Sequence, residues 1–280
     1  RKALEANWKA GGGMPHFQNC DAFVDLMVRR GVSLENARNW ISHGCSQVSS
    51  ADQRGGLMDQ YPNIALCVDL ALHNGMASKT MDLGLHDGIA SNTGKQIGPE
   101  TGDPRAFKSF EEFYRAFQIQ AEHLLTKVLW HERICDRLRG EYFRQPLAST
   151  LMPGPLEKGM DLAIGGLRSY KLNFKKDRGY VPAADSLTAI KKLVYEEKKL
   201  SMAELLEAID SNFAGQRGEE IRQMCLAAPK YGNDIDEADF MVRDNAKFTG
   251  NVILSMKNIW GYNYAINRNG ESWHVAAGAV

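Results

Sequence analysis

The sequence lacks an excess of charge of either sign. Its 280 residues include 34 Lys and Arg and 34 Asp and Glu, so the formal net charge is zero. A protein that grips a nucleic-acid backbone through ion pairs usually carries a basic excess. We therefore expect no nucleic-acid partner.

Paired cysteines and long apolar runs are also absent. The five cysteines are an odd number without a CxxC motif, and they lie far apart at Cys20, Cys45, Cys67, Cys135 and Cys225. Neither they nor the seven histidines have the spacing of a zinc site or a disulfide framework. We expect reduced thiols, no bound metal and a cytoplasmic protein. No apolar stretch approaches the length of a membrane span, so no membrane association is expected.

The two ends of the sequence do not have the character of domain boundaries. The chain starts at Arg1 without an initiator methionine and stops at Val280 within a strand-like segment. We interpret residues 1–280 as part of a single domain that is incomplete at both ends.

Hydrophobic periodicity predicts a helix-rich chain with a few short strands. Helices are expected at residues 3–9, 20–30, after Ser33, and at 61–74, 110–139, 156–163, 184–199, 201–212, 218–227 and 238–256. Strands are expected at 261–266 and 273–277, joined by an Asn-Gly hairpin turn, and a break in regular structure at 146–155. This pattern favours an α/β barrel or a layered α/β protein.

One cysteine stands in an unusual local sequence. An extended run at residues 40–43 leads into Gly44, and Cys45 follows directly, before small hydroxyl residues. Glycine permits a sharp turn and the close approach of another molecule. We therefore predict that Cys45 lies in a loop and is largely buried. A lone cysteine is more often a small buried hydrophobe, so the local pattern alone leaves a structural role open.

A series of short motifs extends this observation along nearly the whole chain. They are a Gly-rich segment at 11–17, Gly44-Cys45, Ala-Leu-His-Asn-Gly at 71–75, Thr-Gly-Asp-Pro at 101–104 followed by Ser-Phe-Glu-Glu at 109–112, the segment 184–194, Ala-Pro-Lys-Tyr-Gly-Asn-Asp at 228–234 and His-Val-Ala-Ala-Gly at 274–278. In this order, the set resembles the glycyl-radical enzymes of the pyruvate formate-lyase-like family. No single motif is specific, whereas the ordered set is.

The resemblance implies a fold and two partners. The fold is a ten-stranded α/β barrel of which residues 1–280 form one part, with two finger loops that meet at its centre. One loop carries a cysteine, which Cys45 matches, and the other a backbone glycyl radical. An iron–sulfur activase that uses S-adenosylmethionine installs this radical, so the activase is an expected partner. A homodimer is one assembly we consider.

The resemblance also implies a reaction type. A thiyl radical at Cys45 would abstract a hydrogen atom from a small organic substrate under anaerobic conditions and start C–C, C–O or C–N bond cleavage or C–C bond formation. Such a radical needs a site that excludes stray reactants. The family's Arg-Val-x-Gly-Tyr radical motif does not occur in this sequence. The chain is therefore not expected to carry the glycyl radical itself or to bind a cofactor.

The residues around the cysteine separate the branches of the family. Its dehydratases, amine lyases and hydroxyarylacetate decarboxylases resemble one another in a Cys-x-Glu motif whose carboxylate moves protons, but this chain has Cys45-Ser46-Gln47. Gln47 can orient a polar substrate and cannot act as a general acid or base. Ser46 excludes the adjacent cysteines of the thioester-forming formate-lyases. The expected substrate-binding residues are Gln47, Asp59, His43 and Phe17.

Several alternatives stay open. One is a synthase that adds hydrocarbons to fumarate, although the Arg of that branch corresponds to Gln60 here and Arg54 is the nearest candidate. An arylacetate decarboxylase is another. A Cys/His hydrolase would use His43 or His16 as its base, without a marked orienting residue. A non-catalytic helical scaffold or decayed paralogue is favoured only by Gln47.

Overall fold

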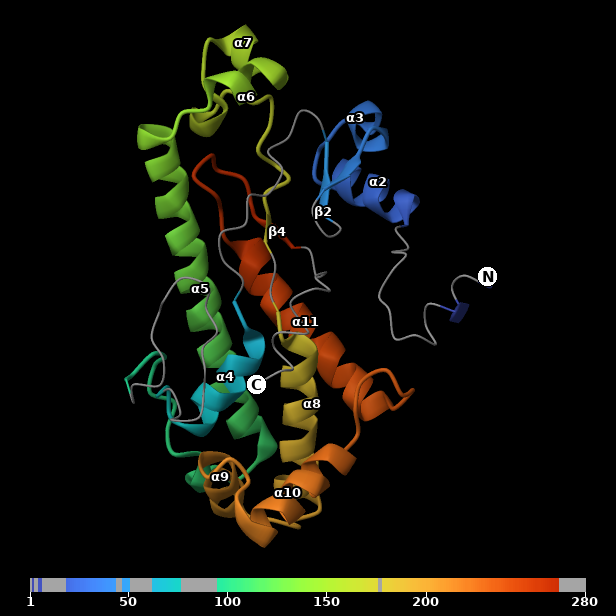
Figure 1. The fold of residues 1–280 in the computed structure, drawn as a ribbon, viewed down its shortest axis with the longest axis vertical. Helices are drawn as coiled ribbons and strands as arrows, with labels where there is room; N and C mark the ends of the chain where they lie inside the picture. Colours follow the sequence, from blue (N-terminus) through green and yellow to red (C-terminus); the bar gives the residue numbers. More distant parts are fainter. Residues whose placement is uncertain are drawn as a thin grey trace. The chain divides into compact units, whose positions relative to one another are not determined.

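A computed structural model describes residues 2, 5–6, 19–43, 47–50, 62–76, 95–175 and 178–266. The chain divides into two compact units. The first contains Arg1–Asp59, His131–Lys176 and Leu254–Val280, and the second contains Gln60–Trp130 and Asp177–Ile253. Both units are rich in helices (Figure 1).

The first unit begins with two capped helices, α2 (Cys20–Arg29) and α3 (Leu34–Arg38). The Asn19 side chain accepts a hydrogen bond from the Ala22 amide, and Ser33 Oγ accepts one from the Asn36 amide. Gly31 ends α2 in the left-handed region, with φ of 80°. These local signals confirm the helices predicted here, because each satisfies backbone groups that a helix end leaves unpaired.

Two short sheets follow in this unit. Strands β1 (Ile41–His43) and β2 (Gln47–Ser49) are antiparallel, and His43 pairs with Gln47. Strands β3 (Phe174–Lys175) and β4 (Ala265–Ile266) are parallel. The extended segment predicted before Cys45 is confirmed. The described residues contain these two two-stranded sheets, and the ten-stranded barrel stays a prediction.

The first unit has a small apolar core. Its buried members are Met27, Val32, Ala37, Val48, Leu172 and Ala265. Phe23, Val24 and Trp40 pack against this cluster, and the rings of Phe23 and Trp40 meet edge to face at 5.2 Å. Burying one such large side chain contributes about 1.5–3 kcal/mol. The core therefore joins α2, α3 and β2 to β4 and to the residue Leu172 just before β3.

Helix α5 (Phe110–Tyr142) contributes residues to both units. As predicted, Ser109 caps it, and the Glu112 amide donates to Ser109 Oγ. Deep in the first unit, Glu132 of α5 forms an ion pair with Lys175 of β3, and their side chains are only 2% and 5% exposed. The Lys175 amine also lies 5.2 Å from the centre of the Tyr264 ring. The pair ties β3 to α5.

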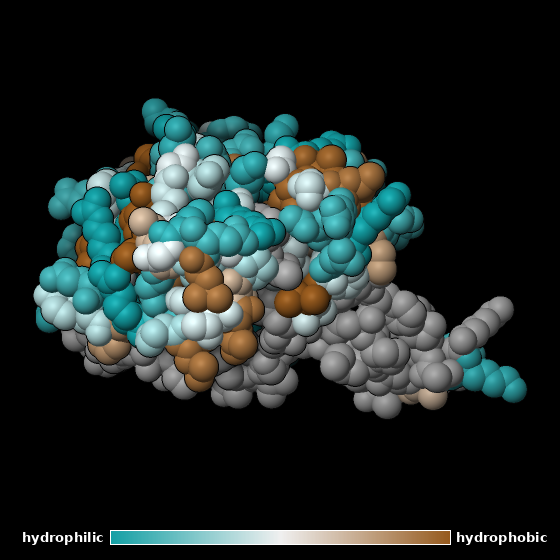
Figure 2. Space-filling view, turned by 90° about the horizontal axis from the view of Figure 1, so that it is seen from above, coloured by the Kyte–Doolittle hydropathy of each residue, from teal (hydrophilic) through white to brown (hydrophobic). Residues whose placement is uncertain are grey.

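Short helices α6 (Pro146–Leu151) and α7 (Pro155–Lys158) and the 3₁₀ turn η2 (Leu162–Ile164) complete the described part of the first unit. Several apolar side chains remain exposed at the end of α5 and on α6 and α7: Ile134, Leu138, Tyr142, Phe143, Leu147, Leu151 and Leu156. Figure 2 shows the hydrophobic side chains of one face in brown. Such exposed apolar side chains are typical of surfaces that contact further protein.

The second unit is built around the buried helix α4 (Ile64–Leu72), which packs on α8 (Tyr180–Ile190). Seven of its residues are buried: Ile64, Leu66, Cys67, Val68, Leu70, Ala71 and Leu72. The other elements of this unit are the 3₁₀ turn η1 (Pro104–Ala106), the π-helix η3 (Lys191–Glu196), α9 (Met202–Asp210), α10 (Gly215–Ala227) and α11 (Asp236–Ser255). The core helix predicted over 61–74 is confirmed.

Several fold predictions are wrong in their details. The expected break at 146–155 contains α6, whose Pro146 occupies the first helical position, where a missing N–H costs nothing. The helix expected at 156–163 is only α7, which ends at Gly159 in the left-handed region. The helix expected at 184–199 begins earlier, at Tyr180, and continues as the π-helix η3.

The terminal strands also differ from expectation. The strand predicted at 261–266 is reduced to β4, and it pairs in parallel with β3, which was not predicted. Its expected hairpin partner at 273–277 lies outside the described residues. The same holds for Val275, whose exposure we predict, and for most of the helix expected at 3–9.

None of the helices in the described ranges has both the length and the apolar character that a lipid-spanning helix requires.

The buried ion pair leads to a stability prediction. Glu132→Ala should lower the free energy of unfolding by about 3–5 kcal/mol, because it removes the carboxylate that balances the charge of the buried Lys175 ammonium. Glu122→Ala is the matched control, since Glu122 is exposed on the same helix. Urea unfolding of the purified protein measures both. A loss for Glu132→Ala no larger than for the control would contradict a buried, coupled pair.

Candidate functional site

The predicted site consists of Cys45 and the substrate-binding residues Gln47, Asp59, His43 and Phe17, and the structure describes only part of this set. Phe17, Cys45 and Asp59 lie outside the described residues. For His43 and Gln47 the backbone is described and the side chain is not. The burial predicted for Cys45, and its contacts with the other predicted site residues, therefore stay predictions.

The structure describes the backbone on either side of the Gly-Cys motif. His43 ends β1, Gln47 begins β2, and the two residues are direct partners in the antiparallel register. Gly44, Cys45 and Ser46 are the residues between them. The structure thus brings the backbones of two predicted site residues together, one on either side of the Gly-Cys motif. We call β1 and β2 together the β1–β2 pair.

The β1–β2 pair is held from one side by an apolar contact. Val48 of β2 is only 2% exposed and belongs to the core that contains Met27, Leu172 and Ala265. Next to Val48, Ser49 and Ser50 are also buried. The residues that follow Cys45 are therefore anchored in the first unit.

A second interaction fastens the same core. The Arg30 guanidinium donates through Nη2 to the carbonyl oxygens of Asn263 at 2.7 Å and Tyr264 at 2.9 Å, and through Nε to that of Lys171 at 3.5 Å. The Lys171 amine in return donates to the Gly31 carbonyl at 2.8 Å. Partial burial lowers the pKa of Arg30. We call these four hydrogen bonds the Arg30 clamp.

Sequence reasoning missed the Arg30 clamp. The acceptors of the Arg30 guanidinium are backbone carbonyls, which every residue type has, and they lie 141 to 234 positions from Arg30. The one available signal was Gly31. Its positive φ turns the chain at the end of α2, and an added Cβ would lie 3.0 Å from the Lys171 amine.

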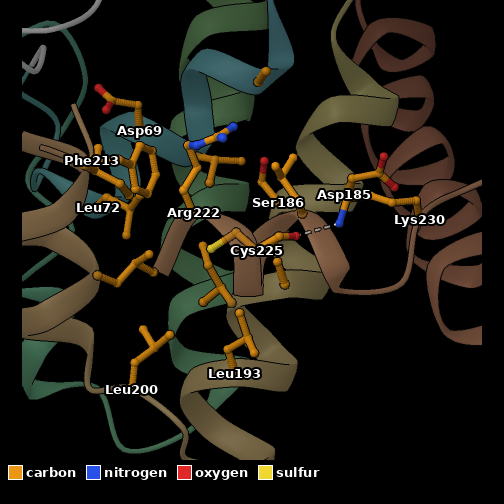
Figure 3. Close-up of a pocket in the computed structure, with 17 residues that line it drawn as sticks. Asp69, Leu72, Asp185, Ser186, Leu193, Leu200, Phe213, Arg222, Cys225 and Lys230 are labelled. Carbon is orange, nitrogen blue, oxygen red and sulfur yellow. Dashed lines mark hydrogen bonds between the residues drawn. The ribbon is translucent and has the colours of Figure 1, made fainter. Parts of the chain in front are cut away.

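A cavity of about 410 Å³ lies in the second unit, among α4, α8, α9 and α10 (Figure 3). Its wall is mostly apolar, with Leu72, Leu193, Leu200 and Phe213 among the lining residues. None of the predicted site residues lines it. This cavity is therefore not the predicted Cys45 site.

Several polar groups that line this cavity have partners within the protein. Lys230 donates to the carbonyls of Cys225 at 2.8 Å and Ala228 at 2.7 Å, and the first of these bonds is drawn in Figure 3. Asp185 accepts from the Tyr231 amide at 2.9 Å. Burial raises the pKa of the Cys225 thiol, which makes it a poor nucleophile at neutral pH. The geometry favours a packing role for these groups.

A charged histidine stands beside the cavity and joins two helices. His73 follows α4, and its Nδ1 lies 2.9 Å from the Asp69 carbonyl oxygen and 3.2 Å from Asp69 Oδ1. Its Nε2 lies 2.9 Å from Oδ1 of Asp210 in α9. The hydrogen bond with the Asp69 carboxylate is the main cause that raises the pKa of His73 to about 9. The ring is therefore protonated at neutral pH.

The described residues also bear on metal binding. No group of three or more His, Cys, Asp and Glu suited to a metal ion occurs in the described part of the chain. Cys135 and His131 of α5 do meet, with Sγ 3.5 Å from Nδ1, but two ligands fall short of the four of a structural zinc site.

The sequence is similar to one protein family along nearly its whole length. The model of the family described as pyruvate formate lyase-like matches residues 1–278. The chain is 31% identical over its whole length to trans-4-hydroxy-L-proline dehydratase of Clostridioides difficile, of which it covers 34%. It is 33% identical over 241 residues to isethionate sulfite-lyase of Oleidesulfovibrio alaskensis, with 84% of this chain and 27% of the relative covered.

The fold agrees with a solved member of this group. The B12-independent glycerol dehydratase of Clostridium butyricum, in its glycerol-bound form, superimposes with a TM-score of 0.77 and 29% identity over 91% of this chain and 30% of that chain. The chain thus spans about a third of the length of the proteins that it matches.

The charge of His73 leads to a pH prediction. A histidine whose pKa is about 9 in the folded protein and roughly 6.5 in the unfolded chain stabilises the fold fully below pH 6.5, and this contribution is lost as the pH rises through 9. The melting temperature of wild type should therefore exceed that of His73→Gln most at pH 6 and least at pH 10.

His123 provides the matched control for this experiment. Burial, reinforced by Lys127, lowers its pKa. The wild-type advantage over His123→Gln should consequently shrink as the pH falls. Thermal melts at pH 5, 6, 8 and 10 compare the variants. A difference for His73→Gln that does not change with pH would contradict a charged His73.

Proposed function

Since the chain belongs to the pyruvate formate lyase-like family, we propose that it is the cysteine-bearing part of a glycyl-radical lyase, with Cys45 as its catalytic residue. The observation that carries this proposal is the Gly44-Cys45 motif between the paired strands β1 and β2, within a family match that extends over 1–278. The curated relatives are a dehydratase and a sulfite-lyase, so elimination from a small organic molecule is the reaction class that we favour.

The chemistry of the thiol explains why a cysteine suits this role. The family's glycyl radical, which lies outside this sequence, would supply the unpaired electron. The Cys45 S–H bond is weak enough to give its hydrogen atom to that glycine. The sulfur that remains takes a hydrogen atom from a substrate carbon, and the S–H bond is strong enough to make this favourable. When the product radical takes the atom back, Cys45 is a thiyl radical again. It would then regain the hydrogen atom of the glycine, which restores both the thiol and the glycyl radical.

Elimination from the substrate also needs proton transfer, and Gln47 limits how this chain performs it. The amide of Gln47 both donates and accepts hydrogen bonds but does not ionise near neutral pH. We propose that Gln47 orients the substrate's polar group, together with His43, Asp59 and Phe17, and that another group moves the proton. A fumarate-adding synthase or an arylacetate decarboxylase is a finer alternative within the same family.

The partners follow from the same proposal. They are the small organic substrate and the iron–sulfur activase that uses S-adenosylmethionine, with a homodimer as one assembly. A cytoplasmic protein without nucleic-acid or membrane contacts fits the zero net charge and the absence of long apolar runs.

Replacement of the cysteine gives the direct test. In the full-length, activated protein, Cys45→Ser should abolish turnover while the glycyl radical still forms. A serine O–H bond is too strong to give a hydrogen atom to a glycyl radical, yet the side chain is nearly isosteric. Electron paramagnetic resonance measures the radical, and product analysis measures turnover.

A matched control separates this role from a general need for thiols. Cys20→Ser changes an exposed cysteine of the same unit and should leave turnover unchanged. If the Cys45→Ser protein turned over its substrate at the wild-type rate, the proposed function would be wrong.

A second variant asks what Gln47 does. If the site resembles that of the dehydratases, Gln47→Glu supplies a carboxylate two residues after Cys45 and should produce eliminase activity on a small 1,2-diol. If Gln47 binds a carboxylate or amide of the native substrate, the same change should only lower native turnover, because Glu repels the one and cannot donate to the other. Product analysis with both substrates distinguishes the outcomes. Unchanged native turnover with no new activity would remove Gln47 from the site.

A further inference from the structure

We propose that Arg30 is a positioning residue, which holds the β1–β2 pair in place and thereby sets the position of the Cys45 thiol. This inference rests on the proposed function, because the position of the thiol matters only if Cys45 reacts. Its structural part, the attachment of Arg30 to the chain segments whose core receives Val48, stands on contacts that the structure describes.

The first step is the attachment of α2. The Arg30 guanidinium donates to the carbonyls of Asn263 and Tyr264 just before β4 and to that of Lys171 before β3. The guanidinium is planar and presents its donors in a rigid fork, so it fixes orientation as well as distance. The reverse bond from Lys171 to the Gly31 carbonyl closes the connection.

The second step leads from the clamp to β2. Leu172 and Ala265 are the direct neighbours of the acceptors Lys171 and Tyr264, and both belong to the apolar core that receives Val48. Met27 of α2, one turn before Arg30, belongs to the same core. The clamp therefore fixes the surfaces against which Val48 packs, and Val48 comes three residues after Cys45.

The third step concerns the stability of the β1–β2 pair without its packing contacts. Each strand of the β1–β2 pair has three residues. An isolated two-stranded hairpin is marginally stable at best in water, so its place depends on the packing beneath it. Hydrogen-atom transfer needs the reacting atoms in near-contact, and a misplacement of ~1 Å can slow such a reaction by about 100-fold. A loosened core would thus reduce turnover before it unfolds the protein.

The test uses three variants of the full-length, activated protein. Arg30→Met removes the donors and keeps much of the aliphatic stem. Arg30→Lys keeps the charge and some of the hydrogen bonds. Arg29→Met is the matched control, because Arg29 is the adjacent residue, lies on the surface and pairs only with its exposed neighbour Asp25 among the ion pairs described. For each variant we would measure kcat per glycyl radical, KM, melting temperature and amide hydrogen exchange of residues 41–49.

For Arg30→Met we expect a fall in kcat of roughly 10- to 100-fold at wild-type radical content, with a much smaller change in KM. Amide exchange in the β1–β2 pair should become faster. Arg30→Lys should recover part of kcat and part of the protection, and Arg29→Met should match wild type. If Arg30 only stabilised the fold, Arg30→Met would lower the melting temperature without changing kcat per glycyl radical, and Arg30→Lys would have no loss of kcat to recover. That result would overturn the inference.

Two results separate this inference from the proposed function. Wild-type turnover by Cys45→Ser would reject the proposed function, and with it the role of Arg30 in positioning a reactive thiol. Loss of turnover in Cys45→Ser together with wild-type kcat and wild-type exchange in Arg30→Met would reject the role of Arg30 alone.

Discussion

A pair of three-residue strands is marginally stable by itself, and this constraint explains how the first unit packs around the β1–β2 pair. The strands of the β1–β2 pair are short, so its position depends on the buried side chain of Val48 in β2. Val48 in turn packs on residues from α2 and from the chain beside β3 and β4. The Arg30 clamp fixes these pieces relative to one another with hydrogen bonds to backbone carbonyls. The apolar core stabilises this part of the first unit, and the directional hydrogen bonds of Arg30 determine how its segments are oriented.

Strand β3 is held from a second direction by charge. Lys175 forms its ion pair with Glu132 of α5, and both side chains are almost fully buried. Such a pair contributes little net stability, because desolvation offsets most of the attraction. It does penalise a shift of β3 in register, since any shift separates two buried charges. We interpret the pair as a device that sets the register of a strand only two residues long.

The sequence predicts the helices better than the strands, and the reason is physical. Caps such as Ser33 and Ser109 and the glycine at position 31 act within a few residues, so the local sequence contains the whole signal. Strand β3 depends on a partner about ninety residues away in the chain, and its sequence of Phe174 and Lys175 has no alternation to detect. Cys45 was singled out by the family resemblance, whereas Arg30, which bonds to distant carbonyls, leaves no motif.

This arrangement separates the residues that would determine the reaction from the residues that would position them. Gln47 begins β2, so its backbone shares the support that the buried Val48 gives this strand. A change of side chain at position 47 can alter the proton chemistry without disturbing that support, because the strand pairs through its main chain. A change at Arg30 would leave the side chain at position 47 intact and, on our proposal, shift the β1–β2 pair as a whole. We therefore expect substitutions that distinguish the reactions of family members at positions such as Gln47. We expect substitutions that slow the reaction without changing its type at positions such as Arg30.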